Sequence, residues 1–500
     1  MPEPPTAGGV QRRDMGGAEP SIVEAFDEAC RDHDAGRADA RDAHLAAIRA
    51  AAASPADGLR LLGAIALRAG RGDVAIAHVA SSDAPAPQTA AQLRDLGQAF
   101  GLVGRLDDAA RCYREALRRA PDDADTQLRL GDTLLAQDRL DEAVASYRAA
   151  LACRPDLVAA LANLGTVLGR LGYADEAEAS HRAALRRAPD LAELHESLGL
   201  ALLRVGKLDE GWSEYEWRLR APTTPSRFAQ PQWAGEPLGD RVLLIHAEQG
   251  FGDTIQFCRY VCSIAAPARV VLEVPEPLVR LLAGLPGGAH IVAHGAPLPP
   301  FDLHCPMLSL PSVFRTTLET VPNQVPYLAV DPARAAAWRE RLAPLGGKRV
   351  GVVWAGRPTH LADRRRSLDL ASLAPLADVP GISFVSLQTG PAAAQAQEPS
   401  PGMVLHDWTA ELDDFAETAA LVAGLDLVIT VDTAVAHLAG ALGRPVWLLN
   451  RFDSCWRWLL ARDDSPWYPS LRQFRQKQPG DWDTVLHEVT AALADYSRLL

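Results

Sequence analysis

Hydrophobic and polar positions follow a different period in each half of the chain. In the first half, small, aromatic and proline residues return every 34 positions within stretches rich in helix formers. The columns are Gly97, Gly131, Gly165 and Gly199; Ala109, Ala143 and Ala177; Tyr113, Tyr147, His181 and Tyr215; Ala116, Ala150 and Ala184; and Pro121, Pro155 and Pro189. Columns that stay in phase predict stacked helix pairs over residues 21–220, with the first copies degenerate.

Each column has a physical reason. Small residues let two helices cross closely, and an aromatic ring fills the space beside them. Proline ends the second helix because it has no N–H to donate. A less regular earlier copy is visible at Gly63, Ala75 and Pro87. The last copy carries Trp212 and Trp217, and we expect its aromatic face to pack on the domain that follows.

In the second half, short β-branched runs alternate with helical stretches, which predicts parallel sheets. The predicted strands are 241–246, 269–274, 290–294, 349–354, 382–387, 425–430 and 445–450. A Gly-rich break near 345–348 divides them into two lobes, and a final helix is expected over 483–499. Ligands bind at the carboxyl ends of strands in such sheets, so the loops there are the candidate sites.

The loop after the first predicted strand contains Gly250, Gly252 and Asp253. The two glycines let the backbone approach a ligand closely. Asp253 falls near a helix start, where it serves either as an N-cap or as a catalytic base, and the residues favour neither. Glu248 is an alternative functional carboxylate in the same loop.

Two further loops favour an anionic ligand. Trp354 and Gly356 precede an arginine cluster that includes Arg365 and Arg366, and arginine clamps phosphate oxygens with two hydrogen bonds. After the strand 425–430, Asp432 and Thr433 open a helix of small residues that carries His437 one turn in. A helix start is a ready anion site, because its N–H groups and dipole both favour negative charge.

The amino-acid composition argues against several classes of function. The net charge of −13 argues against binding nucleic acid across the surface. The three lysines, Lys207, Lys348 and Lys477, stand outside any Gly-Lys-Ser/Thr motif, which excludes a P-loop NTPase. The seven cysteines include no C-x-x-C pair, so neither a zinc framework nor a disulfide scaffold is expected. Without an apolar leader or an 18-residue apolar run, we expect a cytoplasmic protein with no transmembrane segment.

The segment from Gly97 to Pro121 and its copies resemble the tetratricopeptide repeat, which implies a concave surface for a peptide or another protein. The second half resembles glycosyltransferase family 9, the heptosyltransferase-like enzymes. The motifs that carry this resemblance are Asp432 to Gly443, Gly351 to Gly356, Arg364 to Leu368, Ser386 to Gly390, Asp414 to Leu421, Trp456 to Leu459 and Ser465 to Pro469. The fold class expected is therefore an α-solenoid followed by a GT-B fold of two Rossmann-like lobes.

The resemblance implies roles for individual residues. Asp253 would be the general base. The donor would be bound by Gly252, Trp354, Gly356, Arg365, Arg366, Gln388, Asp432, Thr433 and His437. Of these, Arg366, Arg365 and the helix start at Thr433 would stabilise the leaving diphosphate, and Gln388 and Trp354 would line the nucleotide. No cofactor and no metal are expected.

The expected organisation is a disordered leader over 1–20, repeats over 21–220 and a linker over 221–239. An acceptor lobe over 240–345, a nucleotide-sugar lobe over 346–480 and a C-terminal helix over 481–500 would follow. The function implied is an inverting transfer from a nucleotide-sugar to an acceptor hydroxyl, with the repeats recruiting a protein or peptide. Two alternatives stay open: a non-catalytic repeat scaffold, and a saccharide or glycolipid transferase whose repeats serve assembly.

Overall fold

The computed structural model describes residues 20–50, 89–221, 227–264 and 269–498. The chain divides into two compact units, one formed by Met1–Leu168 with Ala179–Ala188 and the other by Gly169–Glu178 with Pro189–Leu500. The repeats expected over 21–220 are therefore shared between the units. The predicted leader, apart from Pro20, and the early copy at Gly63, Ala75 and Pro87 lie outside the described residues.

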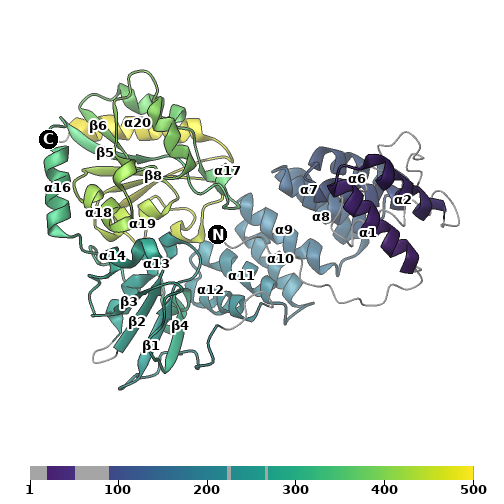
Figure 1. Cartoon of the computed structure of the whole chain (residues 1–500), viewed down its shortest axis with the longest axis horizontal. Helices are drawn as coiled ribbons and strands as arrows, with labels where there is room; N and C mark the ends of the chain where they lie inside the picture. Colours follow the sequence, from purple (N-terminus) through teal and green to yellow (C-terminus); the bar gives the residue numbers. More distant parts are fainter. Residues whose placement is uncertain (1–19, 51–88, 222–226, 265–268, 499–500) are drawn as a thin grey trace. The chain divides into compact units, whose positions relative to one another are not determined.

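Helices make up the described part of the first unit. Successive helices pair, α1 with α2, α5 with α6 and α7 with α8 (Figure 1). Their bounds are α1 (Pro20–Asp34), α2 (Ala38–Ala50), α5 (Ala90–Leu102), α6 (Leu106–Arg119), α7 (Ala124–Ala136), α8 (Leu140–Cys153), α9 (Val158–Arg170) and α10 (Ala174–Leu185). The last residues of α9 and the first of α10 belong to the second unit.

The glycine and aromatic columns meet in three of the described helix pairs, whereas a Cβ added to Gly199 would meet the backbone of Tyr215 rather than its ring. A Cβ added to Gly97 would lie 2.8 Å from the Tyr113 ring, and one added to Gly131 would lie 2.6 Å from the Tyr147 ring. A Cβ on Gly165 would lie 2.8 Å from the His181 ring. The 34-residue period is therefore the spacing of one repeated contact, in which an aromatic ring rests on a glycine of the preceding helix.

The second unit begins with the last helices of the repeats, α11 (Ala192–Arg204), α12 (Leu208–Tyr215) and the 3-10 helix η1 (Glu216–Arg220). A four-stranded parallel sheet follows in the order β3-β2-β1-β4. Its strands are β1 (Val242–His246), β2 (Arg269–Val274), β3 (His290–Ala293) and β4 (Leu303–Pro306). Within the predicted linker, Gln232 forms a parallel bridge with His304, so this segment extends the sheet beside β4.

A six-stranded parallel sheet comes next, in the order β10-β9-β8-β5-β6-β7. Its strands are β5 (Lys348–Val353), β6 (Ile382–Ser386), β7 (Leu405–Asp407), β8 (Leu427–Val431), β9 (Val446–Asn450) and β10 (Leu471–Arg475). All seven predicted strands form, and the prediction of parallel sheets is confirmed. Sequence analysis missed β4, β7 and β10, because they are short or carry polar residues and proline.

Helices cover both faces of the second sheet (Figure 1). On β8, Val428 packs in the core that contains α18 and α19, while Leu427 and Ile429 pack in the core that contains α20. Burial on both faces explains why these strands are uniformly apolar. The helices of this unit after η1 are α13 (Phe251–Phe257), α14 (Val279–Leu282), α15 (Leu310–Val313), α16 (Pro332–Leu342), α17 (Asp363–Arg366), α18 (Phe415–Ala423), α19 (Ala434–Ala441) and α20 (Trp482–Arg498).

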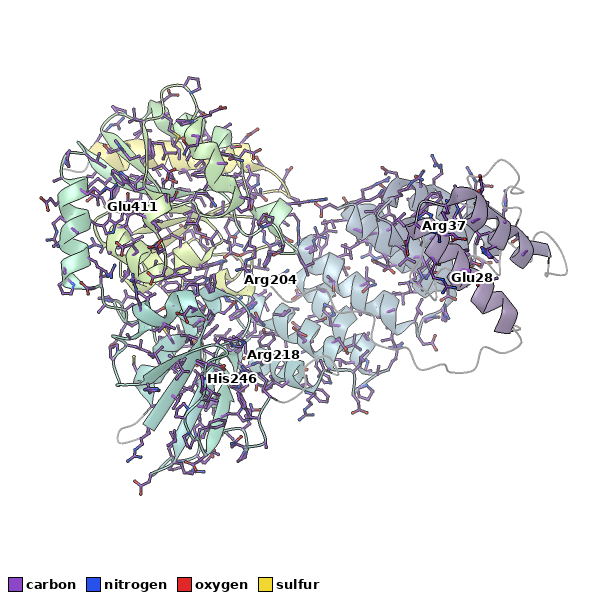
Figure 2. The ribbon with its side chains drawn as sticks, viewed as in Figure 1. Glu28, Arg37, Arg204, Arg218, His246 and Glu411 are labelled. Carbon is purple, nitrogen blue, oxygen red and sulfur yellow. The ribbon has the colours of Figure 1, made fainter. Side chains whose placement is uncertain are left out.

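The last repeat packs on the domain that follows through Trp212, whereas Trp217 stacks on His195 within the repeat itself. Trp212 is 2% exposed and donates from its indole nitrogen to the carbonyl of Thr316 at 3.1 Å. Its ring meets that of Trp456 edge-on at 5.2 Å. Arg218 on η1 approaches the end of β1, which terminates at His246 (Figure 2). In the described part of the chain, no helix is both long and apolar enough to span a membrane.

Candidate functional site

The loop after β1 places Asp253 at the third position of α13. Its Oδ2 accepts a hydrogen bond of 2.8 Å from the backbone N–H of Gly250, which caps the start of the helix. Its Oδ1 faces the other way and forms an ion pair with Arg457. The N-cap role that the sequence left open for Asp253 is therefore wrong, because Gly250 is the N-cap residue and Asp253 caps its N–H from the third helical position with one of its two carboxylate oxygens.

Arg457 belongs to the 3-10 helix η8 (Trp456–Trp458), which follows β9. Its side chain is only 10% exposed, and that of Asp253 is 15% exposed. Burial opposes the charge of Arg457, but the carboxylate of Asp253, together with Cys455 and Tyr215, outweighs burial and raises the pKa of the guanidinium above its usual value. Sequence analysis gave Arg457 no role, because nothing in the neighbouring sequence indicates that it pairs with a residue far away along the chain.

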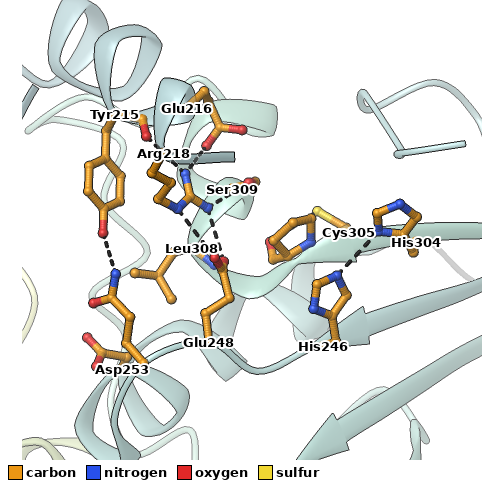
Figure 3. Close-up of polar contacts among 12 residues, drawn as sticks. Tyr215, Glu216, Arg218, His246, Glu248, Asp253, His304, Cys305, Leu308 and Ser309 are labelled. Carbon is orange, nitrogen blue, oxygen red and sulfur yellow. Dashed lines mark hydrogen bonds and ion pairs between the residues drawn. The ribbon is translucent and has the colours of Figure 1, made fainter. Parts of the chain in front are cut away.

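Glu248, the alternative carboxylate, is held by the last repeat (Figure 3). Arg218 on η1 donates to Oε2 of Glu248 at 3.0 Å, and the N–H of Leu308 donates to the same oxygen at 3.1 Å. The next residue, Gln249, has a φ of 57° and donates to the hydroxyl of Tyr215 at 2.6 Å. The loop that presents Asp253 is thus anchored on two side chains of the last repeat.

The helix α19 faces α13. His437 on α19 is 4% exposed and shares a 3.0 Å hydrogen bond with the hydroxyl of Tyr468. A Cβ added to Gly252 would lie 2.8 Å from its Cδ2 atom. Burial lowers the pKa of His437 to about 3, so the ring is neutral near pH 7. Glycine at 252 therefore lets the loop of the first sheet lie directly on the predicted donor helix.

The start of α19 is linked to the arginine cluster. Thr433 is the N-cap residue, but its hydroxyl contacts that of Thr430 at 3.1 Å and makes no cap hydrogen bond. Arg366 on α17 donates to the carbonyl of Asp432 at 2.8 Å, and its guanidinium lies against Gly356. Gly356 leaves room for this side chain, since a larger residue there would collide with it.

Gln388 and Trp354 make internal contacts. The Gln388 carboxamide accepts hydrogen bonds from the N–H groups of Trp354 at 3.1 Å and Ala355 at 2.8 Å, and donates to the carbonyl of Ala355 at 3.1 Å. Trp354 is fully buried. The two residues thus brace the loop after β5, and their expected contact with a nucleotide stays a prediction.

Most predicted site residues form two connected groups. Gly252, Asp253 and His437 lie where α13 meets α19, and Gly356, Arg366, Asp432 and Thr433 lie beside the start of α19. Trp458 joins them, because it stacks on His437 at 4.9 Å and donates to Oδ1 of Asp432 at 2.9 Å. Arg365 instead forms an ion pair with Asp453. Sequence analysis missed Trp458, although it stands in a quoted motif.

Residues 20–50, 89–221, 227–264 and 269–498 contain no group of three or more His, Cys, Asp or Glu side chains that could hold a metal ion. The cation that contacts the backbone at the start of α19 is Arg366. Arginine and a helix start are both able to stabilise phosphate oxygens. The expectation that no metal or cofactor takes part stays a prediction.

Comparisons with known proteins match both halves of the chain. Residues 94–157 match a tetratricopeptide repeat model, and residues 410–451 match the model of glycosyltransferase family 9 (heptosyltransferase). The second match contains α18, β8, α19 and β9, and with them Asp432, Thr433 and His437.

A curated relative is protein FlbA of Caulobacter vibrioides, 30% identical over 313 residues that cover 57% of this chain and 52% of that protein. The chain thus spans about half the length of this relative. Two solved structures of MamA are each 22% identical; they cover 32% and 34% of this chain and 92% of their own, with TM-scores of 0.29 and 0.30. The chain therefore carries tetratricopeptide repeats followed by a region similar to glycosyltransferase family 9, as its sequence predicts.

Proposed function

We propose that this chain is an inverting, metal-independent glycosyltransferase that moves a sugar from a nucleotide-sugar to an acceptor hydroxyl. In this proposal the four-stranded and six-stranded sheets are the acceptor and donor lobes of a GT-B fold. One observation carries the proposal. The first turn of α13, which carries Asp253, lies directly on α19, with Gly252 in contact with His437. A candidate base and a candidate phosphate site are thereby adjacent.

The proposed reaction uses Asp253 as the general base. The carboxylate removes the proton of the acceptor hydroxyl while that oxygen attacks the anomeric carbon, and the bond from this carbon to the donor phosphate breaks. Attack on the face opposite the leaving group inverts the anomeric configuration. Arg457 orients the carboxylate, and the second oxygen of Asp253 keeps its hydrogen bond to Gly250.

The leaving nucleoside diphosphate carries the charge that this site would stabilise. Arg366 reaches the start of α19, where the helix dipole and the first N–H groups attract negative charge. His437, neutral near pH 7, would contact the donor as a hydrogen-bonding group rather than as a cation. These groups supply the electrostatic stabilisation that many transferases draw from a metal ion.

The repeats would recruit the acceptor. Tetratricopeptide repeats indicate an interaction with protein, and we propose a protein or peptide acceptor for that reason. Labelled transfer can be followed in parallel to a protein extract, to soluble saccharides and to a lipid fraction. Incorporation of label into protein supports the proposal. Incorporation only into saccharide or lipid would show that the acceptor is a saccharide or a lipid rather than a protein.

Donor binding is the first test. Unfolding of the full chain is followed in the presence of nucleoside diphosphates and sugar nucleotides that differ in base and sugar. A donor at 100 times its dissociation constant should stabilise the fold by about 2.7 kcal/mol. The proposal is supported if donors that share one nucleobase stabilise the fold and one of them also gives labelled sugar transfer. If no donor raises the unfolding temperature, the chain is better explained as a non-catalytic repeat scaffold.

A further inference from the structure

The aromatic column of the repeats is used differently in its last copy. In three earlier copies the ring of Tyr113, Tyr147 or His181 lies on a glycine of the preceding helix. In the last copy the atoms nearest to a Cβ on Gly199 belong to the backbone, and the closest is the nitrogen of Tyr215, at 2.7 Å. Here the backbone of α12, rather than an aromatic ring, rests on the glycine.

The hydroxyl of Tyr215 reaches out of the repeat. It accepts a hydrogen bond of 2.6 Å from the carboxamide of Gln249, in the loop after β1. The hydroxyl of Tyr147, at the same column position, donates instead to Asp132 on α7, the other helix of its pair, at 2.9 Å. Both tyrosines are buried. Equivalent residues thus make different connections, one within its repeat and the other from the repeat to the loop.

Gln249 has a strained backbone conformation. Its φ of 57° lies in the left-handed region, which a residue with a long side chain rarely adopts. Such a conformation persists only where the surroundings hold it, and it is found most often at functional sites. Gln249 directly precedes Gly250, whose N–H donates to Oδ2 of Asp253. The conformation of Gln249 therefore sets the position of the N–H group that fixes the carboxylate.

Arg218 holds the neighbouring residue of the same loop, Glu248 (Figure 3). It donates to both carboxylate oxygens of Glu248, at 3.3 and 3.0 Å. The remaining N–H groups of the guanidinium donate to Ser309, to Glu216 and to the carbonyl of Tyr215. The guanidinium also lies over the ring of Tyr215, 4.7 Å from its centroid. Because all five of its donors are used, Arg218 is a rigid support rather than a group awaiting a ligand.

We propose that Tyr215 and Arg218 are positioning residues for Asp253, so that the last repeat is a fixed part of the catalytic site as well as the end of the repeats. This inference rests on the proposed function for the role of Asp253 as the base. The two side chains hold Glu248 and Gln249, and through them the turn at Gly250 that orients the carboxylate. Neither side chain takes part in the reaction itself.

Tyr215→Phe tests the inference with the smallest change, because it keeps the ring and removes only the hydroxyl. It should lower kcat by about 10-fold to 100-fold, since a displacement of about 1 Å at a catalytic group costs on the order of 100-fold. The KM for the donor should change by less than about twofold, because most of the proposed donor residues follow strands of the other sheet. A wild-type kcat in Tyr215→Phe would overturn the inference.

Tyr147→Phe is the matched control. It removes a buried hydroxyl hydrogen bond from the same column position, and Asp132 keeps its hydrogen bond from Asn163. Both variants should lower the unfolding temperature by similar amounts, but only Tyr215→Phe should lower kcat. An equal fall of kcat in the two variants would show a general loss of packing and would overturn the positioning role.

Two further variants test the route to Asp253. Gln249→Met removes the other end of the hydrogen bond of Tyr215, so the double variant should have the kcat of either single variant. Losses that multiply in the double variant would overturn this route. Arg218→Lys keeps the charge but loses the paired hydrogen bonds to Glu248, and kcat should fall by about 10-fold. An unchanged kcat in Arg218→Lys would remove Arg218 from the inference.

Amide hydrogen exchange of the full chain supplies a readout that needs no activity. In Tyr215→Phe the first turn of α13 should exchange several-fold faster than in wild type, whereas α19 should not change. If this occurs but wild type transfers no sugar from any donor, the positioning stands and the proposed function is wrong. If wild type transfers sugar while Tyr215→Phe keeps the wild-type kcat and exchange, the positioning is wrong and the proposed function stands.

Discussion

Asp253 and Arg457, 204 positions apart in the sequence, form an ion pair that joins the loop after β1 to the segment after β9. The pair holds the candidate base against the sheet that carries the candidate donor site. It also constrains any test of Asp253, because a substitution there leaves a buried arginine without its partner. Stability and activity must therefore be measured on the same variants.

Asp253→Asn should reduce sugar transfer by about 100-fold to 10,000-fold, the usual contribution of a general base. It should also lower the free energy of unfolding by about 3–5 kcal/mol, because Arg457 loses its carboxylate. The double variant Asp253→Asn with Arg457→Met should recover most of the stability and none of the activity. Denaturant titration and labelled transfer measure the two effects, and activity in the double variant would refute the base assignment.

The contact of Gly252 with His437 predicts a steric effect. Gly252→Ala should lower the free energy of unfolding by about 1–3 kcal/mol, because the added methyl group forces α13 and α19 apart. Donor binding should weaken in the same variant. Gly284→Ala is the control, since a Cβ at Gly284 meets no atom within 4 Å. Equal unfolding temperatures for the two variants would mean that the helices adjust without strain.

The repeated glycine–aromatic contact can be tested within one helix. Gly97 and Gly101 both lie on α5, but a Cβ at Gly97 would meet Tyr113 while one at Gly101 would meet nothing within 4 Å. Gly101→Ala should raise the stability of the repeats by about 0.5–1 kcal/mol through helix propensity, and Gly97→Ala should lower it. Thermal unfolding followed by circular dichroism compares the two, and a stabilising Gly97→Ala would contradict the packing argument.

His437 predicts a loss of stability in acid. Burial lowers its pKa from the ordinary value of 6.5 to about 3 in the folded chain, so the unfolded state binds the additional proton between these values. Stability should therefore fall as the pH falls from about 6.5, by at most about 1.4 kcal/mol per pH unit for this group. His437→Gln should reduce this slope in denaturant titrations at several pH values.

Burial also lowers the pKa of His246, to about 4. This residue should contribute a similar dependence of stability on pH, which His246→Gln tests. His487 lies exposed on α20, and His487→Gln is the matched control substitution. An unchanged slope in His437→Gln would show that the ring is protonated at no cost to the fold.

The sequence by itself determined the repeats, the seven strongest strands and the loops that carry the candidate chemistry. The 34-residue columns follow from a glycine–aromatic contact that recurs in three of the described helix pairs, and the apolar runs follow from strands buried on both faces. A contact between residues close in the sequence also explains the first turn of α13. There the carboxylate of Asp253 accepts a hydrogen bond from the backbone N–H of Gly250, three residues before it.

Only the tertiary structure decided which of these residues meet. Strand β7 has three residues and β10 carries two arginines, so they become strands through pairing with neighbours rather than through an apolar pattern. The partners of Asp253 and Glu248 come from η8 and from the last repeat, and Arg204 meets the loop after β9 because α11 packs there. Such contacts depend on how whole elements pack, and no local run of residues encodes them.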